Sequence, residues 1–109
     1  MDNRNTSRKK VHINTVIFLN GKRHESIAEN LSDNGLCITT SPTTSAIDFI
    51  PGSFPEVQFS TDSGESIDLK CQVRWLHSFM MPTSSVVNTL GMQIMTTNQE
   101  YVAYFEALQ

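Results

Sequence analysis

A chain of 109 residues suffices for one domain with a real hydrophobic core and leaves little room for a second. Hydrophobic residues make up 39% of the chain and charged residues 17%, a balance typical of soluble globular proteins that argues against disorder. No apolar run approaches the ~18–20 residues that span a bilayer, and the basic N-terminus lacks the apolar segment of a secretory signal. We therefore expect a cytoplasmic protein without membrane insertion.

The net charge of −3 is unevenly distributed along the chain. The first ten residues contain four of the eight basic residues and one acidic residue, whereas the other 99 contain four basic and ten acidic residues. A basic arm on an acidic body fits a small anionic ligand better than a long nucleic-acid track, which needs a basic face on the domain. The alternative is a solvated tail without a binding role. We treat residues 1–10 as a flexible basic arm and 11–109 as a single domain.

The cysteines and histidines do not form a recognisable metal-binding pattern. Cys37 and Cys71 lack C-x-x-C spacing and lie in predicted strands, so we expect buried free thiols, with a disulfide between neighbouring strands as the alternative. His12, His24 and His77 are scattered and have no ligand spacing among themselves or with the cysteines. No metal and no cofactor are predicted.

Apolar residues alternate with polar ones in short segments that turn-forming residues separate. Strands are expected at residues 11–19, 23–31, 36–40, 55–62, 67–75 and 90–96. The pairs Asn20-Gly21 and Ser63-Gly64 are hairpin signals, because a tight two-residue turn needs residues that accept positive φ. The alternation of 67–75 is unbroken, so one face of this strand is expected in the core.

Two segments are predicted to be irregular. Residues 41–55 contain three of the four prolines, which mark a loop, and residues 79–89 form the second segment. The apolar cluster Phe79-Met80-Met81 is expected to fold back onto the core, with a partner-binding surface as the alternative. Trp75 is in phase with the core residues of its strand, so we expect it to pack inside.

The hydrophobic period changes at the C-terminus. Thr97 begins a T-x-x-E pattern, the form of a capping box, and apolar residues then recur on one helical face. A helix at about residues 98–108 would be marginal alone and must dock on the sheet. The predicted fold is therefore mainly all-β: a small six-stranded antiparallel β-barrel with a short C-terminal α-helix that seals one end.

One stretch after the second predicted strand is dense in groups that hydrogen-bond nearby backbone. It reads Asn30-Leu31-Ser32-Asp33-Asn34-Gly35. By itself this stretch is most simply a turn between strands. The basic arm, however, carries Arg4 and Arg8 four positions apart, so arm and turn could together form one anion-binding site.

The order of these features resembles the PilZ domain. The shared features are an R-x-x-x-R arm, a first β-hairpin, an N-x-S-x-x-G stretch after its second strand, a barrel and a closing helix, and they span essentially the whole chain. The resemblance implies a bacterial receptor for the second messenger cyclic di-GMP. In that family the arginine arm wraps the ligand against the barrel, and its ordering would signal to a protein partner, whose identity the sequence does not give.

The resemblance also implies which residues bind the ligand. Arg4 and Arg8 would contact phosphates and guanine edges, while Asn30, Ser32 and Gly35 would shape the floor of the site. A guanidinium suits this role, because its planar fork matches a phosphate or the O6/N7 edge of guanine and also stacks on a base. The family often has Asp at the position of Asn30, and an amide forms a weaker hydrogen bond than a carboxylate.

Two further residues are candidate ligand contacts. Lys9 could add phosphate attraction, with a solvated strand charge as the alternative. Trp75 could place its ring against a guanine instead of in the core, as aromatic residues do near this position in the family. The neighbouring Arg74 is most simply a solvent-facing charge.

The residues of the chain favour a binding protein over an enzyme. No nucleophile motif, phosphate-cradling glycine loop or paired-carboxylate pattern is present, so we predict a binding module and no enzyme. The alternative to a cyclic di-GMP receptor is a PilZ-like protein–protein adaptor that does not bind nucleotide. A small β-barrel that binds single-stranded nucleic acid ranks third, because the body is acidic and outward aromatic residues are few; no DNA partner is expected.

Overall fold

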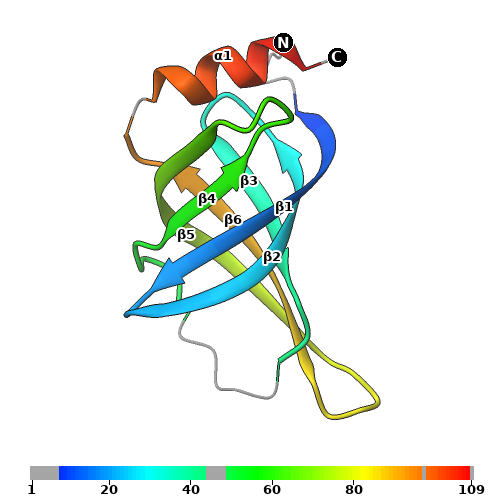
Figure 1. The fold of residues 1–109 in the computed structure, drawn as a ribbon. Coiled ribbons are helices and arrows are strands. Elements are labelled where there is room, and N and C mark those ends of the chain that lie inside the picture. Colours follow the sequence, from blue (N-terminus) through cyan, green and yellow to red (C-terminus); the bar gives the residue numbers. More distant parts are fainter. Residues whose placement is uncertain (1–7, 44–48, 97, 109) are drawn as a thin grey trace, which may run out of the picture.

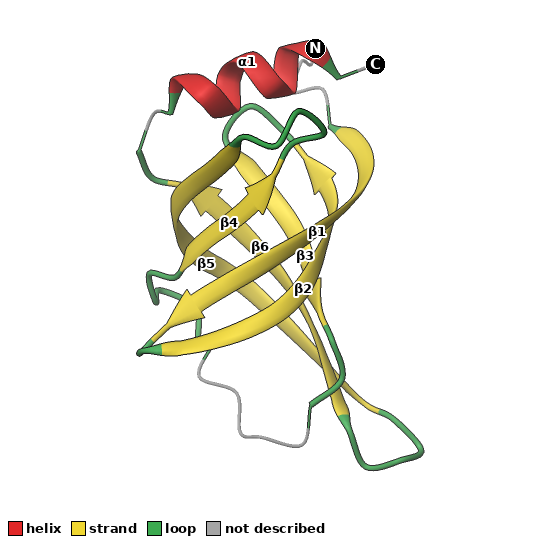
Figure 2. Cartoon of the chain, in the orientation of Figure 1, coloured by secondary structure: helices red, strands yellow, loops and turns green. Residues whose placement is uncertain are grey.

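The computed structural model describes residues 8–43, 49–96 and 98–108, which form six strands and one helix (Figures 1 and 2). The elements are β1 (Lys9–Leu19), β2 (Lys22–Leu31), β3 (Gly35–Thr40), β4 (Glu56–Ser60), β5 (Ser66–Met80), β6 (Val86–Ile94) and α1 (Gln99–Ala107). All strand pairs are antiparallel, and the sheet closes into a ring in the order β1-β2-β3-β6-β5-β4. The predicted fold class is confirmed. Within the described residues no helix is long and apolar enough to cross a membrane.

Local turn chemistry sets the two short hairpins. Asn20 and Gly21 have φ of 55° and 76° and join β1 to β2 with Leu19 opposite Lys22, as a two-residue turn with positive φ at both positions requires. Gly64, with φ of 91°, lies in the turn between β4 and β5. Both predicted hairpins are confirmed.

The core fills the inside of the ring. Its side chains come from alternate positions of all six strands, together with Phe49 from the loop before β4 and Tyr101 from α1. Cys71 belongs to this core, and burial raises the pKa of its thiol to about 12. Cys37 and Cys71 are both free thiols, so the disulfide alternative is not realised.

Helix α1 lies across one end of the ring (Figure 1), where the sequence predicted a seal. Its N-cap is Asn98 and not Thr97, because the Asn98 side-chain oxygen accepts from the Tyr101 backbone N–H at 2.9 Å. The Asn98 amide also donates to the Asp68 carbonyl oxygen at 2.8 Å, which ties the cap to β5. Thr97 lies outside the described residues.

The prediction of an irregular segment at 79–89 is wrong over most of its length. β5 continues to Met80 and β6 begins at Val86, so that the two strands form a long hairpin that extends beyond the ring (Figure 2). The apolar cluster does not fold back onto the core, since Phe79 is 55% and Met80 76% exposed. The sequence of this part of β5 does not alternate between apolar and polar residues, because both faces of the strand are exposed here. The strand could therefore not be predicted from its pattern.

The expected burial of Trp75 is also wrong. Val73 pairs with Met92, but Trp75 pairs with Gly91, so Arg74 is an extra residue that has no partner in β6. Such a bulge reverses the alternation of the strand. Trp75 therefore lies on the outer face, 42% exposed.

Candidate functional site

Strand pairing brings the start of β1 to the turn at residues 30–35. Lys9 pairs with Leu31 and Lys10 pairs with Asn30 in the β1–β2 ladder. Arg8 directly precedes β1, so its side chain begins beside the turn that the sequence singled out. The arm and the turn, which are about twenty residues apart in the chain, thus meet through an ordinary hairpin.

Residues 30–35 comprise the end of β2, a tight turn at 32–34 and the first residue of β3, and this turn is fixed from two sides. The Ser32 backbone N–H donates to the Gly35 carbonyl oxygen at 2.9 Å, and the Ser32 hydroxyl lies 3.3 Å from the Asn34 side-chain oxygen. From α1, the Tyr101 hydroxyl donates to the Ser32 carbonyl oxygen at 2.6 Å. From β6, the Ile94 N–H donates to the Asn34 carbonyl oxygen at 2.8 Å. The turn is therefore a preorganised part of the surface.

Gly35 is required at its position by close packing. A Cβ added there would lie 2.9 Å from the Met92 carbonyl oxygen of β6, an approach that side chains essentially never make. β3 begins at this glycine and pairs at once with β6, Leu36 lying opposite Met92. A small residue thus lets the turn and β6 form one continuous floor.

A surface pocket of about 170 Å³ opens at this place. Its lining residues come from the start of β1, the turn, β3, β5 and β6, and they are Arg8, Asn30, Leu31, Ser32, Gly35, Leu36, Cys37, Arg74, Trp75, Gly91 and Met92. Of the predicted site residues, the structure thus brings together Arg8, Asn30, Ser32, Gly35 and Trp75. Arg4 lies outside the described residues.

Trp75 forms one wall of the pocket because Gly91 leaves room for it. The indole ring lies so close over Gly91 that any Cβ at that position would overlap the ring. The bulge in β5 turns the side chain outward, and the glycine opposite in β6 allows the ring to lie close to the strand. This combination presents an aromatic face beside the arginine and the turn.

Arg74 is exposed, as the sequence predicted, and it also lines the pocket. Its guanidinium Nη1 donates to the Gln93 side-chain oxygen at 2.7 Å, which holds the side chain across β6. The described pocket lining therefore contains two guanidiniums and no carboxylate, although the chain as a whole is acidic. Such a local excess of positive charge favours an anionic ligand.

Lys9 is not brought to this pocket. Its ammonium donates to the carbonyl oxygens of Phe105 and Leu108, at 2.8 and 3.0 Å, and lies 4.4 Å from the centre of the Phe105 ring. These carbonyls end α1, where a cation is favourable. Lys9 therefore ties β1 to the C-terminus of the helix.

Cys37 also lines the pocket and is half-buried. Burial, with a smaller contribution from Glu29, raises the pKa of the Cys37 thiol, so this side chain is a neutral part of the pocket lining.

A larger groove of about 550 Å³ lies over β1 and β4, but the carboxylates of Glu25 and Asp62 line it together with Arg23. In the described part of the chain no three His, Cys, Asp or Glu residues are grouped to hold a metal.

The model of the protein family described as "PilZ domain" matches residues 2–107 of this chain. The fold is similar to the PilZ domain of YcgR from Escherichia coli solved with c-di-GMP, with a TM-score of 0.69 and 9% identity over 91% of this chain and 82% of that chain. No curated protein sequence matches significantly.

Two further solved structures are similar in fold. The Bacillus subtilis inhibitor of motility MotI/DgrA gives a TM-score of 0.61 with 15% identity over 96% of this chain and 49% of that chain. The K. pneumonia MrkH–c-di-GMP complex gives 0.62 with 14% identity, over 92% and 48%. The present chain thus spans about half the length of these two proteins. Because the family model covers nearly the whole sequence, the chain belongs to the PilZ domain family.

Proposed function

We propose that this protein binds cyclic di-GMP in the pocket between Arg8, the turn at residues 30–35 and Trp75. The single observation that carries the proposal is that five residues from three separate parts of the sequence line one pocket: Arg8, Asn30, Ser32, Gly35 and Trp75. Membership of the PilZ family supports the same ligand, since two of the similar structures, those of YcgR and MrkH, were solved with c-di-GMP.

Each wall of the pocket has a chemical role towards such a ligand. The Arg8 and Arg74 guanidiniums can each pair with a phosphate or a guanine O6/N7 edge through two parallel hydrogen bonds. The exposed face of Trp75 can stack on a guanine, an interaction worth about 1–3 kcal/mol per base. The Asn30 amide can both accept from and donate to a guanine edge. In this proposal these groups bind and orient the ligand and do not cleave it.

The size of the pocket indicates how the rest of the ligand is held. About 170 Å³ accommodates part of a dinucleotide, so the remainder must lie over the rim, where the arm joins the chain at Arg8. Arg4 is four residues further along the arm and can reach up to about 14 Å from Arg8. In this proposal the arm closes over the ligand, and the surface that it then presents signals to a partner protein of the bacterial cytoplasm.

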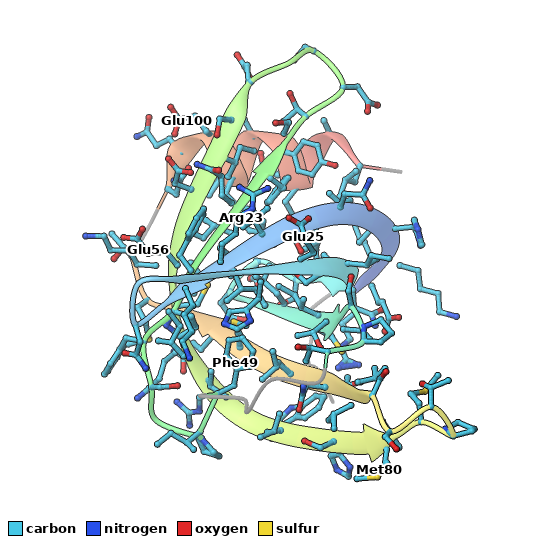
Figure 3. All side chains as sticks on the ribbon, turned by 60° about the horizontal axis from the view of Figure 1, so that its bottom comes forward. Arg23, Glu25, Phe49, Glu56, Met80 and Glu100 are labelled. Carbon is cyan, nitrogen blue, oxygen red and sulfur yellow. The ribbon has the colours of Figure 1, made fainter. Side chains whose placement is uncertain are left out.

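Calorimetric titration of cyclic di-GMP into the wild type and into Arg8→Ala tests the proposal. We expect micromolar or tighter binding to the wild type and a loss of at least tenfold in affinity, about 1.4 kcal/mol, in the variant. Arg23→Ala is the matched control, because Arg23 is an exposed arginine that pairs with Glu25 at 3.0 Å (Figure 3) and does not line the pocket. Its affinity should equal that of the wild type.

Two results would contradict the proposal. A wild type that does not bind cyclic di-GMP at moderate salt would favour the adaptor function instead. Equal affinities for Arg8→Ala and Arg23→Ala would place the ligand outside this pocket.

A further inference from the structure

The outer part of the β5–β6 hairpin lacks charged residues. All eight Lys and Arg and all eleven Asp and Glu residues lie before position 75 or after position 99. The hairpin instead exposes large apolar side chains, among them Phe79 at 55% and Met80 at 76%. Figure 3 labels Met80 at the outer end of β5. An exposed apolar surface without charges is rare on a monomeric protein and indicates a contact site.

One edge of this hairpin is a strand edge without a backbone partner in the described part of the chain. β5 pairs with β4 only as far as Lys70, and the loop before β4 covers its next residues through Ser53 and Pro55. From Trp75 to Met80, β5 pairs with β6 and with no other strand in the described residues. Natural proteins protect such edges with lysines, prolines or inward charges, and this edge has none of these between Trp75 and Met80.

The edge is complementary to itself. Trp75, His77 and Phe79 project from the same face of β5, with ring centres 6.0 Å and 6.4 Å apart in succession. If a second copy pairs antiparallel with His77 opposite itself, residues equally far from His77 lie opposite each other. Trp75 then faces Phe79 of the second copy in two symmetric aromatic pairs, a favourable cross-strand combination.

We propose that two copies of this protein form a two-fold symmetric dimer by antiparallel pairing of their β5 edges, centred on His77. A second copy is favoured over other occupants because its own edge supplies both the matching aromatic residues and the same unpaired backbone groups. The charge distribution agrees: the two acidic bodies repel, and the uncharged hairpin is the surface where they can meet without like charges. An anionic membrane is disfavoured for the same reason.

The dimer would place the second copy beside the candidate ligand pocket. Trp75 is both a wall of that pocket and a member of the cross-strand pair, so Phe79 of the second copy would lie beside the same indole ring that the ligand is proposed to contact. This consequence for ligand binding rests on the function proposed above. The dimer itself does not, and it can be measured without nucleotide.

A charge-swap experiment tests the pairing register. Sedimentation velocity of the full chain without ligand should show a concentration-dependent monomer–dimer equilibrium. His77→Asp and His77→Lys each place like charges opposite one another at the axis, so each variant alone should dimerise at least tenfold more weakly. An equimolar mixture of the two variants places Asp opposite Lys and should recover dimers that contain one copy of each.

The matched control is Met95→Asp, which introduces the same charge at an exposed residue outside the hairpin. This variant should dimerise like the wild type. Far-UV circular dichroism checks that each variant is folded. The proposal is overturned if the wild type stays monomeric up to hundreds of micromolar. It is equally overturned if the single variants remain dimeric, if their mixture stays monomeric, or if Met95→Asp dissociates as they do.

Discussion

Replacing Tyr101 with alanine is expected to destabilise the protein by about 3–5 kcal/mol, the usual cost of deleting a buried aromatic side chain. Tyr101 is only 2% exposed and is the one residue of α1 that is fully buried in the core. Its hydroxyl also donates to the Ser32 carbonyl oxygen at 2.6 Å. Urea unfolding followed by circular dichroism measures the change in the free energy of unfolding.

The variant Tyr101→Phe separates the ring from the hydroxyl. It keeps the packing and removes one hydrogen bond, so a loss of only about 0.5–1.5 kcal/mol is expected. If Tyr101→Ala costs less than about 1 kcal/mol by the same measurement, α1 does not contribute to the core as described. Equal losses in the two variants would mean that the hydrogen bond to the turn, and not the ring, attaches the helix.

Gly91→Ala is expected to weaken cyclic di-GMP binding by about 1–3 kcal/mol, the contribution of one stacked base. A Cβ at position 91 overlaps the indole of Trp75, so the ring must leave its place over β6. Trp75 is already 42% exposed, and moving it outward should cost the fold little. Calorimetry gives the affinity, and urea unfolding checks that stability is nearly unchanged.

A double-mutant cycle shows whether Gly91→Ala acts through Trp75. In the Trp75→Ala background the substitution at Gly91 should have no further effect on affinity, because the ring that it displaces is gone. Additive losses would contradict this, since the two residues would then act independently. If Gly91→Ala alone binds cyclic di-GMP with unchanged affinity, Trp75 does not contact the ligand.

The sequence predicts best where local chemistry decides the structure. The turn at Asn20-Gly21 needs positive φ at two positions, and the structure has both. The six strands and the terminal helix follow from changes of hydrophobic period that are visible without any tertiary information. The position of Arg8 beside the turn also follows, because the hairpin fixes which ends of β1 and β2 meet.

Features that depend on pairing between distant strands could not be predicted. The bulge at Arg74 exists only in relation to β6, and it moves Trp75 from the expected core to the pocket and brings Arg74 there as well. Lys9 is adjacent to Arg8 in sequence, yet its ammonium reaches α1, which lies almost a hundred residues away along the chain. The outer hairpin escaped prediction because an element exposed on both faces has no alternation.

The intrinsic fluorescence of Trp75 tests most directly whether cyclic di-GMP binds in this pocket. Trp75 is the sole tryptophan of the chain, so at a fixed protein concentration its emission reports on the pocket wall, with free tryptophan as the control for absorption by the ligand. We predict a saturable change in emission on titration with cyclic di-GMP, with a midpoint that matches the calorimetric affinity and shifts to higher concentration in Arg8→Ala. Emission that stays unchanged while calorimetry detects binding would place the ligand elsewhere and contradict the account.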